Sequence, residues 1–442
     1  MSTNIDEVIE REPLGRLRLL LLILISLTII VDGFDIQMIA FVSPVLIEQW
    51  GVTKSDLAIA VSAAFVGMAV GAPLGGWIGD KWGRRNAITA SVFFFGIATM
   101  AVALAGNLTE LSLLRFIGGL GFGAVLPNAT ALIAEWMPST IRSYAISMMI
   151  VGVPVGGMFG ASVSHSLISA FGWESCFLAG GALGVILGPL LWAFLPESPK
   201  FLLRRSPSSP ELPKLMQRAF PARGLGDAGS FSTEDVVGAS RSAIFAPSRR
   251  MVTIGLTVAF FANLLVFYGF ANWMPTILTS KGLPLEVALR GALYFNLFGL
   301  AGAVAVAAIV SKVGARKGLL GVLVGGIAAS ILLALVIETQ PIPPQLVTLT
   351  LAVAGMFLAG LQVGLYALAA GAYPTDCRST GVGFAAGVGR LGPILSAVAG
   401  GIFLDMKGGS VWFFSLAVLF LIVAIVGVTL VREGAPAPLA ER

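Results

Sequence analysis

The run LRLLLLILISLTIIVDGFDIQMIAFVSPV occupies residues 17–45 and decides the class of fold. A helix needs about 20 predominantly apolar residues to cross the hydrocarbon core of a bilayer, and this run exceeds that length. Similar runs recur along the chain, so the sequence predicts an all-α membrane protein. We predict twelve transmembrane helices at 17–45, 55–78, 86–105, 110–134, 143–166, 172–195, 251–275, 286–311, 317–337, 344–368, 378–403 and 410–431.

The composition excludes whole classes of protein. Of the 442 residues, 57% are hydrophobic and 12% are charged, whereas soluble domains carry about 25% charged residues. Soluble, disordered and nucleic-acid-binding proteins are therefore excluded. The two cysteines, Cys176 and Cys377, are expected on opposite membrane faces and so unpaired, and the lone His165 argues against a metal site. We expect no cleavable signal peptide, because the first apolar run is too long.

The distribution of basic residues sets the orientation. Most of the 28 Lys and Arg residues fall in the tails and in loops on one side, whereas the other loops hold only Lys54, Lys281, Arg290 and Lys407. Since cytoplasmic loops carry the basic excess, we expect both termini to lie in the cytoplasm. We expect the protein itself to lie in the inner membrane of the cell.

The stretch 196–250 separates six predicted helices from six. It begins PESPKFLLRRSPSSPELPK, and it is expected to be a cytoplasmic linker with short surface helices. Motifs repeat across it: GDKWGRR (79–85) matches VSKVGAR (310–316), and Pro138-x-x-x-Arg142 matches Pro374-x-x-x-Arg378. Parallel six-helix halves are a transporter architecture that binds substrate near the membrane midplane. The predicted parts are a cytoplasmic tail 1–16, a bundle 17–195, the linker 196–250, a bundle 251–431 and a cytoplasmic tail 432–442.

Charges inside the predicted helices mark candidate functional residues, because each costs about 2.5–3.5 kcal/mol on insertion scales. Asp32 and Asp35 share one helix face, and two acids so close resist ionising together, so one should hold a proton near neutral pH. Arg115 must pair with a protein acid or a bound anion. Arg390 is the preferred bidentate anchor for an anionic substrate. A fixed ion pair that only holds helices together remains the alternative for each.

Other residues receive conformational or binding roles. Glu135 and Arg378 are expected at the inner face, as a gate or as solvated charges. In the loop motif Gly76-x-x-Gly79-Asp80-x-x-Gly83-Arg84-Arg85, Asp80 is expected at a neighbouring helix N-terminus and Arg84 is expected to tie span ends together. Arg142 joins Arg378 as a gating candidate. A pocket for a flat ring, with Asp35, Arg115 and Arg390, is expected from Asn272, Tyr268, Phe267, Tyr294, Asn296, Gln362, Tyr366 and Phe384.

Six sequence motifs resemble those of known families. GWIGDKWGRR (76–85) resembles the loop 2–3 signature of the major facilitator superfamily. Within that superfamily the chain resembles the aromatic acid:proton symporters, through DGFD (32–35), RFIGGLGFGAVLPNATALIAEWMP (115–138), PESPKFL (196–202), NWMPTIL (272–278) and YPTDCRSTGVGFAAGVGRLGP (373–393). The resemblance implies roles in transport for Asp32, Asp35, Arg115, Glu135, Arg378 and Arg390, besides Asp80 and Arg84 in the loop. Trp136 stands where a tyrosine is expected, Ser311 stands where the first half has Asp80, and the second half lacks a histidine.

The sequence thus predicts a proton-coupled symporter that imports a benzoate-like or hydroxybenzoate-like anion by alternating access. Proton coupling is assigned to Asp32, Asp35, Arg115 and Glu135. No Walker loop and no nucleophile–base arrangement is evident, so we expect no ATP, no cofactor and no enzyme activity. The expected partners are the aromatic acid, protons and lipid, not nucleic acid, and the chain is expected to be a monomer. Alternatives are a carrier of non-aromatic organic or sugar acids, a drug:proton antiporter, a membrane enzyme, or a transport-like sensor.

Overall fold

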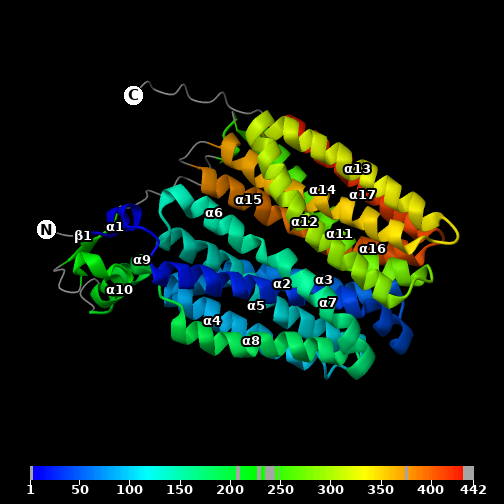
Figure 1. The fold of residues 1–442 in the computed structure, drawn as a ribbon, viewed down its shortest axis with the longest axis horizontal. Coiled ribbons are helices and arrows are strands. Elements are labelled where there is room, and N and C mark those ends of the chain that lie inside the picture. Colours follow the sequence, from blue (N-terminus) through cyan, green and yellow to red (C-terminus); the bar gives the residue numbers. More distant parts are fainter. Residues whose placement is uncertain are drawn as a thin grey trace. The chain divides into compact units, whose positions relative to one another are not determined.

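The computed structural model describes residues 3–205, 210–225, 230–233, 244–247, 249–373 and 377–431. Within those ranges, twelve helical stretches are long and apolar enough to cross a membrane, which confirms the predicted number (Figure 1). The predicted tail 432–442 lies outside the described residues. The helices of the first half are α2 (Arg16–Trp50), α3 (Lys54–Trp82), α4 (Arg84–Val102), α5 (Leu108–Trp136), α6 (Ser139–Ile150), α7 (Gly152–Phe171) and α8 (Glu174–Phe194). Those of the second half are α11 (Arg250–Ser280), α12 (Leu285–Val313), α13 (Ala315–Glu338), α14 (Pro344–Ala372), α15 (Arg378–Gly389), α16 (Leu391–Asp405) and α17 (Gly409–Leu430).

Several helices run further than predicted. The spans predicted to end at 45, 78, 275 and 368 continue to Trp50, Trp82, Ser280 and Ala372. A helix satisfies its own backbone hydrogen bonds, so it continues past the apolar window into the interface, where polar side chains are tolerated. Hydropathy alone therefore underestimates helix length.

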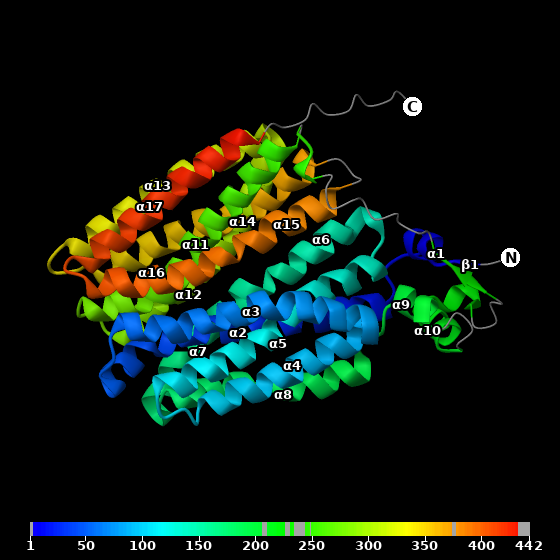
Figure 2. The same cartoon turned by 180° about the vertical axis from the view of Figure 1, so that it is seen from behind.

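The fifth and eleventh spans, each predicted as one helix, are both broken in the middle. The first half breaks at Val151, between α6 and α7, and the second half breaks at Arg390, between α15 and α16. A proline follows each break by three residues, Pro154 and Pro393. Proline lacks the N–H that would bond the carbonyl four residues earlier, and those carbonyls belong to Ile150 and Gly389, the last residues of α6 and α15. Figure 2 shows α15 and α16 following one another in line.

The described coordinates divide into two compact units. The first comprises residues 1–38, 63–160 and 166–236, and the second comprises 39–62, 161–165 and 237–442. The C-terminal end of α2 and the N-terminal end of α3 therefore belong with the second-half helices. Each unit has its own core of aliphatic and aromatic side chains.

The N-terminal tail, predicted as a cytoplasmic tail, pairs with the linker. The strand β1 (Thr3–Asn4) pairs in parallel with β2 (Phe231–Ser232), and the helix α1 (Ile5–Arg11) follows it. The linker adds the short helices α9 (Pro199–Arg205), α10 (Glu211–Ala219) and η1 (Pro221–Arg223). Buried Arg18 holds the tail, because its guanidinium donates to the carbonyls of Ile9 at 3.2 Å and Glu12 at 2.6 Å.

Candidate functional site

The first unit contains a buried ion pair. Asp35 on α2 lies 2.9 Å from the Arg115 guanidinium on α5, and both side chains are almost fully buried. The Thr99 hydroxyl on α4 donates to the other Asp35 oxygen at 2.7 Å. Three helices therefore converge on one carboxylate. Asp32 lies one turn earlier on α2 and is 4% exposed, so the predicted acid pair is buried as a whole.

Gly33, between the two acids, brings α2 against α7. A Cβ atom at this position would lie 2.3 Å from the Val153 carbonyl oxygen, which is backbone and cannot rotate away. The DGFD motif thus holds its acids beside a close helix crossing, as small residues do inside membranes.

We expect Gly33→Val to lower the midpoint of thermal unfolding in detergent by several degrees and to stop transport, since α2 and α7 must separate. Gly321→Ala on α13 is the control, because nothing lies within 4 Å of the added Cβ and alanine favours helix by about 1 kcal/mol. Equal unfolding midpoints for the two variants would contradict the close crossing.

The second unit contains a basic and polar cluster at the break before α16. The Arg390 guanidinium lies near enough to act electrostatically on the Tyr366 phenol of α14, and Gln362 hydrogen-bonds that phenol. The Asn263 amide on α11 donates to Gln362. The Phe260 ring meets the Tyr366 ring edge-on, with centroids 5.0 Å apart. A half-buried arginine beside a phenol and amides can bind a carboxylate through its fork of N–H groups.

The predicted ring pocket is only partly assembled. Phe267 packs on Phe295 with centroids 5.6 Å apart and on Tyr268 at 5.3 Å. Asn296 donates to the Ala292 carbonyl of its own helix at 3.0 Å. Asn272 is buried, and its neighbour Trp273 is fully buried against α16, not at the membrane interface.

Two predicted pocket residues lie elsewhere. Phe384, on the second turn of α15, packs edge-on against Phe245, with centroids 5.1 Å apart, and not against the aromatic residues of α11 and α12. Tyr294 lines a separate cavity of about 400 Å³ between α12 and α14, together with Arg290 and Phe298. Both placements correct the prediction that these rings join one pocket.

Arg84, the first residue of α4, connects α3, α4 and α5. Its guanidinium pairs with Asp80, donates to Asn128 at 3.3 Å, and lies 3.8 Å from Glu135. Glu135 thus has a partner within its own unit, while its predicted gate partner Arg378 belongs to the other unit, where it donates to the Tyr373 carbonyl.

Asp80 meets the start of α4 through the side chain of Arg84, the first residue of that helix, whereas the acid that accepts from a backbone N–H of α4 is Glu197. The Glu197 carboxylate accepts from the Arg85 N–H at 3.1 Å, and its backbone carbonyl accepts from the Trp136 indole at 3.1 Å. Burial raises the pKa of Glu197 above its ordinary value, although the N–H groups around it oppose that shift. The PESPK stretch was noted in the sequence, but its glutamate was not assigned this function.

The predicted gating residue Arg142 sits near the start of α6. It donates to the Met137 carbonyl at 3.2 Å and lies 3.7 Å from Glu10 of the N-terminal helix α1. Glu10 also accepts from the Ser139 N–H at 2.8 Å, and so it caps α6. Nothing in the tail sequence singled out Glu10.

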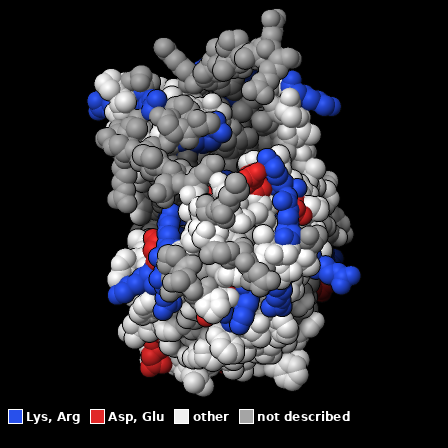
Figure 3. All heavy atoms as spheres, turned by 90° about the vertical axis from the view of Figure 1, so that its left-hand side faces the viewer, with Lys and Arg blue, Asp and Glu red and all other residues white. Residues whose placement is uncertain are grey.

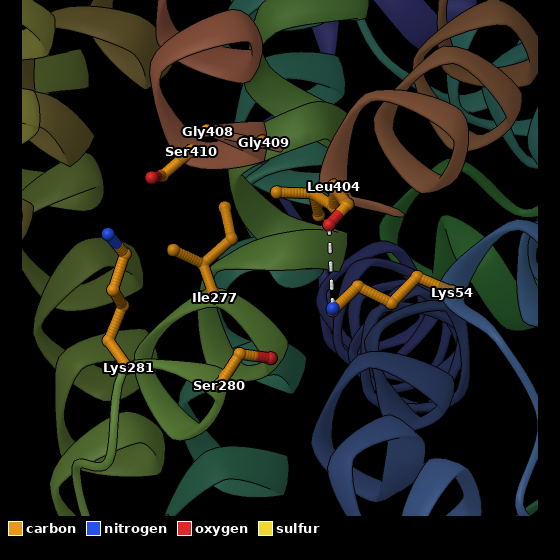
Figure 4. Close-up of a pocket in the computed structure, with 8 residues that line it drawn as sticks. All are labelled: Lys54, Ile277, Ser280, Lys281, Leu404, Gly408, Gly409 and Ser410. Carbon is orange, nitrogen blue, oxygen red and sulfur yellow. Dashed lines mark hydrogen bonds between the residues drawn. The ribbon is translucent and has the colours of Figure 1, made fainter. Parts of the chain in front are cut away.

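A cavity of about 210 Å³ opens in the second unit, where α3 begins and α16 ends (Figure 4). Lys54 from α3 reaches the Leu404 carbonyl at 3.5 Å, and Lys281 pairs with Glu338 at 2.7 Å. Asp405 accepts from the Ser55 N–H at 2.7 Å, so it caps α3. This carboxylate joins the start of α3 to α16.

Comparison with known proteins agrees with this architecture. The model of the Major Facilitator Superfamily matches residues 25–351. The chain belongs to the Major Facilitator Superfamily. Among solved structures of this superfamily fold, a D-xylose–proton symporter superimposes with a TM-score of 0.74 at 18% identity, over 94% of this chain and 98% of the other.

Within the Major Facilitator Superfamily, the chain is similar to transporters of aromatic acids. A gallate transporter from Pseudomonas putida is 34% identical, over 93% of this chain and 91% of the relative. A 4-hydroxybenzoate transporter from Acinetobacter baylyi is 32% identical, over 96% and 92%. The chain is therefore a multi-pass membrane transporter of the aromatic acid transporter family, and not an enzyme.

Proposed function

We propose that this protein imports an aromatic carboxylate together with protons. The carboxylate binds the Arg390 guanidinium beside Tyr366 and Gln362, and the ring lies against the aromatic side chains of α11. The observation that carries the proposal is an arginine at a helix break, next to a phenol and two amides. The similarity of the whole chain to transporters named for gallate and 4-hydroxybenzoate supports an aromatic acid as the substrate.

The buried Asp35–Arg115 pair supports proton coupling. A proton on Asp35 would remove the negative charge that neutralises the Arg115 guanidinium. The guanidinium would then pair with another acceptor, and the three helices that meet at Asp35 would rearrange. We propose that Asp32 and Asp35 carry the proton and that no bound cofactor takes part. Loading more than one proton per monoanion would use the membrane potential, which supplies about 2.3 kcal/mol per charge per 100 mV.

The proposed location is the inner membrane, with both termini in the cytoplasm and a single chain as the working unit. Figure 3, which views the end bearing α1 and α10, shows more Lys and Arg than Asp and Glu. That excess is the one expected on a cytoplasmic face.

Uptake into proteoliposomes tests the proposal. We expect the purified protein to accumulate labelled aromatic acids when the outside is made acidic, and accumulation to collapse when a protonophore removes the gradient. Sugar acids and aliphatic acids serve as competitors. Uptake of a sugar acid with none of any aromatic acid would overturn the proposed substrate, and uptake that ignores the protonophore would overturn the coupling.

A further inference from the structure

The cavity of about 400 Å³ between α12 and α14 contains none of the residues of the Arg390 cluster. Its volume lies within the range of about 300–1,000 Å³ that is typical of small-molecule sites. The lining combines one charged side chain, two other polar side chains, a phenol and an apolar remainder: Arg290, Gln345, Thr348, Tyr294, Val287, Phe298, Pro344, Leu349 and Ala352. All of these residues belong to α12 or α14, so the cavity lies along a single pair of helices.

Close packing of α12 on α14 shows which residues lie at the same level. A Cβ atom on Gly291 would lie 2.7 Å from the Leu351 side chain, and one on Gly355 would lie 2.1 Å from the Phe295 carbonyl oxygen. Both contacts join residues that are 60 positions apart in the sequence. The two helices therefore run parallel with their N-terminal ends side by side, and Gln345 of α14 lies level with the first turn of α12.

One stripe of α12 changes from charged to apolar with distance from the helix N-terminus. Four residues follow one another at intervals of four positions, and so share one helix face: Glu286, Arg290, Tyr294 and Phe298. Successive members lie about 6 Å apart along the axis. Glu286 pairs with Arg290, and the Tyr294 ring meets the Phe298 ring edge-on with centroids 6.3 Å apart. The order is therefore carboxylate, guanidinium, phenol and apolar ring.

This stripe faces away from the other helices that pack on α12. Ala292 belongs to a core cluster with residues of α2 and α7. Arg290 and Tyr294 each stand two residues from Ala292, which is about 200° around the helix. Because α12 is long and apolar enough to cross a membrane, and Phe298 and Leu349 are 41% and 58% exposed, the cavity opens toward lipid.

The order of groups along the stripe matches that of a phospholipid. From the membrane surface inward, a phospholipid presents its headgroup, phosphate, ester groups and acyl chains. Arg290 lies about 7.5 Å into α12, where a long basic side chain extends to the interface, and its guanidinium fork suits a phosphate. Tyr294 then lies at the level of the esters, and Phe298 and Leu349 lie at the level of the acyl chains.

The charges at the N-terminal end of the stripe select the headgroup. The Glu286–Arg290 pair has no net charge, so it complements a headgroup that carries both signs. With the phosphate on Arg290, the outermost headgroup atoms lie one turn nearer the helix start, beside Glu286 and Gln345. A protonated primary amine there donates N–H groups to the carboxylate. A quaternary amine has no N–H to donate, and a purely anionic headgroup meets a like charge.

We propose that the cavity between α12 and α14 binds a phospholipid with a phosphoethanolamine headgroup. The phosphate binds Arg290, and the ammonium group binds Glu286. An ester carbonyl accepts from the Tyr294 hydroxyl, and one acyl chain lies against Phe298 and Leu349. The site lies apart from the Arg390 cluster, so the inference does not depend on the identity of the transported substrate.

Lipid binding to the full chain, purified in a mild detergent, tests this inference. The probes are dioleoyl phosphatidylethanolamine, its N-methyl and N,N-dimethyl derivatives, phosphatidylcholine and phosphatidylglycerol, and native mass spectrometry measures their retention. We expect phosphatidylethanolamine to be retained about 3- to 10-fold better than phosphatidylcholine, the effect of one charge-assisted hydrogen bond in a partly exposed site. The same lipid should raise the midpoint of thermal unfolding the most, because it binds the folded state.

Three variants assign the groups. Glu286→Gln should abolish the preference for ethanolamine over choline and should improve retention of phosphatidylglycerol, because the negative charge is gone. Arg290→Gln should weaken retention of the ethanolamine and choline lipids alike, by about tenfold, because both carry the phosphate. Lys312→Gln is the matched control, since Lys312 lies in the last turn of α12, at the other end of the helix, and the wild-type order of lipids should persist.

Each contrary result has a distinct meaning. Equal retention of the ethanolamine and choline lipids by the wild type would overturn the headgroup assignment, and this comparison needs no variant. Stronger retention of phosphatidylglycerol than of phosphatidylethanolamine would overturn the role of Glu286. If Arg290→Gln and Lys312→Gln retain lipid equally well, the lipid binds elsewhere on the surface. None of these measurements uses transport, so a failure of the proposed function is detected separately, by uptake.

Discussion

Asp35→Ala is expected to lower the free energy of unfolding by about 3–5 kcal/mol and to reduce proton-driven uptake to background. The substitution leaves the Arg115 guanidinium buried without its carboxylate, and removing one partner of a buried pair carries a penalty of that size. Unfolding of the purified protein in detergent gives the first quantity, and uptake at an imposed pH gradient gives the second.

A double variant separates stability from transport. Asp35→Asn with Arg115→Gln replaces both charges by neutral groups of similar shape, so we expect most of the lost stability to return. Transport should stay at background, because the proton acceptor is gone. Glu286→Gln is the control, since its pair with Arg290 is about half exposed, and exposed pairs contribute about 0–1 kcal/mol. If the double variant transports at the wild-type rate, the pair only holds helices together.

The spans were predictable because each crosses a bilayer and must be apolar over its length. The sequence also contains the cause of the two helix breaks, Pro154 and Pro393. Hydropathy is averaged over a window of residues, so it does not detect the single backbone N–H that each proline lacks. The ordered tail was not predictable, since its order depends on Arg18 and on pairing with a strand more than 220 residues later.

The sequence predicted which types of residue form the site better than it predicted which of them contact one another. The sequence predicted Asp35 and Arg115 within membrane spans, but it left open whether Arg115 pairs with a protein acid or with a substrate. The sequence of one helix does not indicate which residues of other helices contact it. Thr99 was missed for the same reason. Phe384 was predicted to share a pocket with the aromatic residues of α11 and α12 because all of them are aromatic, but its ring packs against Phe245.

Helical phase could have corrected one part of the pocket. Tyr294 and Asn296 are two residues apart, so they lie about 200° apart around α12 and cannot face the same pocket. The structure separates them accordingly: Tyr294 lines the cavity with Arg290, and Asn296 is buried. Residue type predicted what the side chains can bind, whereas phase determines which of them act together.

Arg390→Ala is expected to weaken binding of an aromatic carboxylate by more than 30-fold, corresponding to at least about 2 kcal/mol, the lower range for truncating one partner of a hydrogen-bonded charge pair. Arg390→Lys keeps the charge but loses the planar fork, so its affinity should fall between those of the wild type and the alanine variant. Titration of the purified protein gives the affinities.

Ligand-induced stabilisation provides an independent readout of the same prediction. A substrate at 100 times the wild-type Kd should stabilise the wild type by about 2.7 kcal/mol, and at the same concentration the gain in Arg390→Ala should fall to about 0.9 kcal/mol or less, while the unliganded unfolding midpoint changes little. Arg290→Ala is the matched control, because that arginine lies in the same unit but pairs with exposed Glu286. An Arg390→Ala variant that keeps both affinity and stabilisation would remove Arg390 from the binding site, and would direct the search for the carboxylate anchor to Arg115.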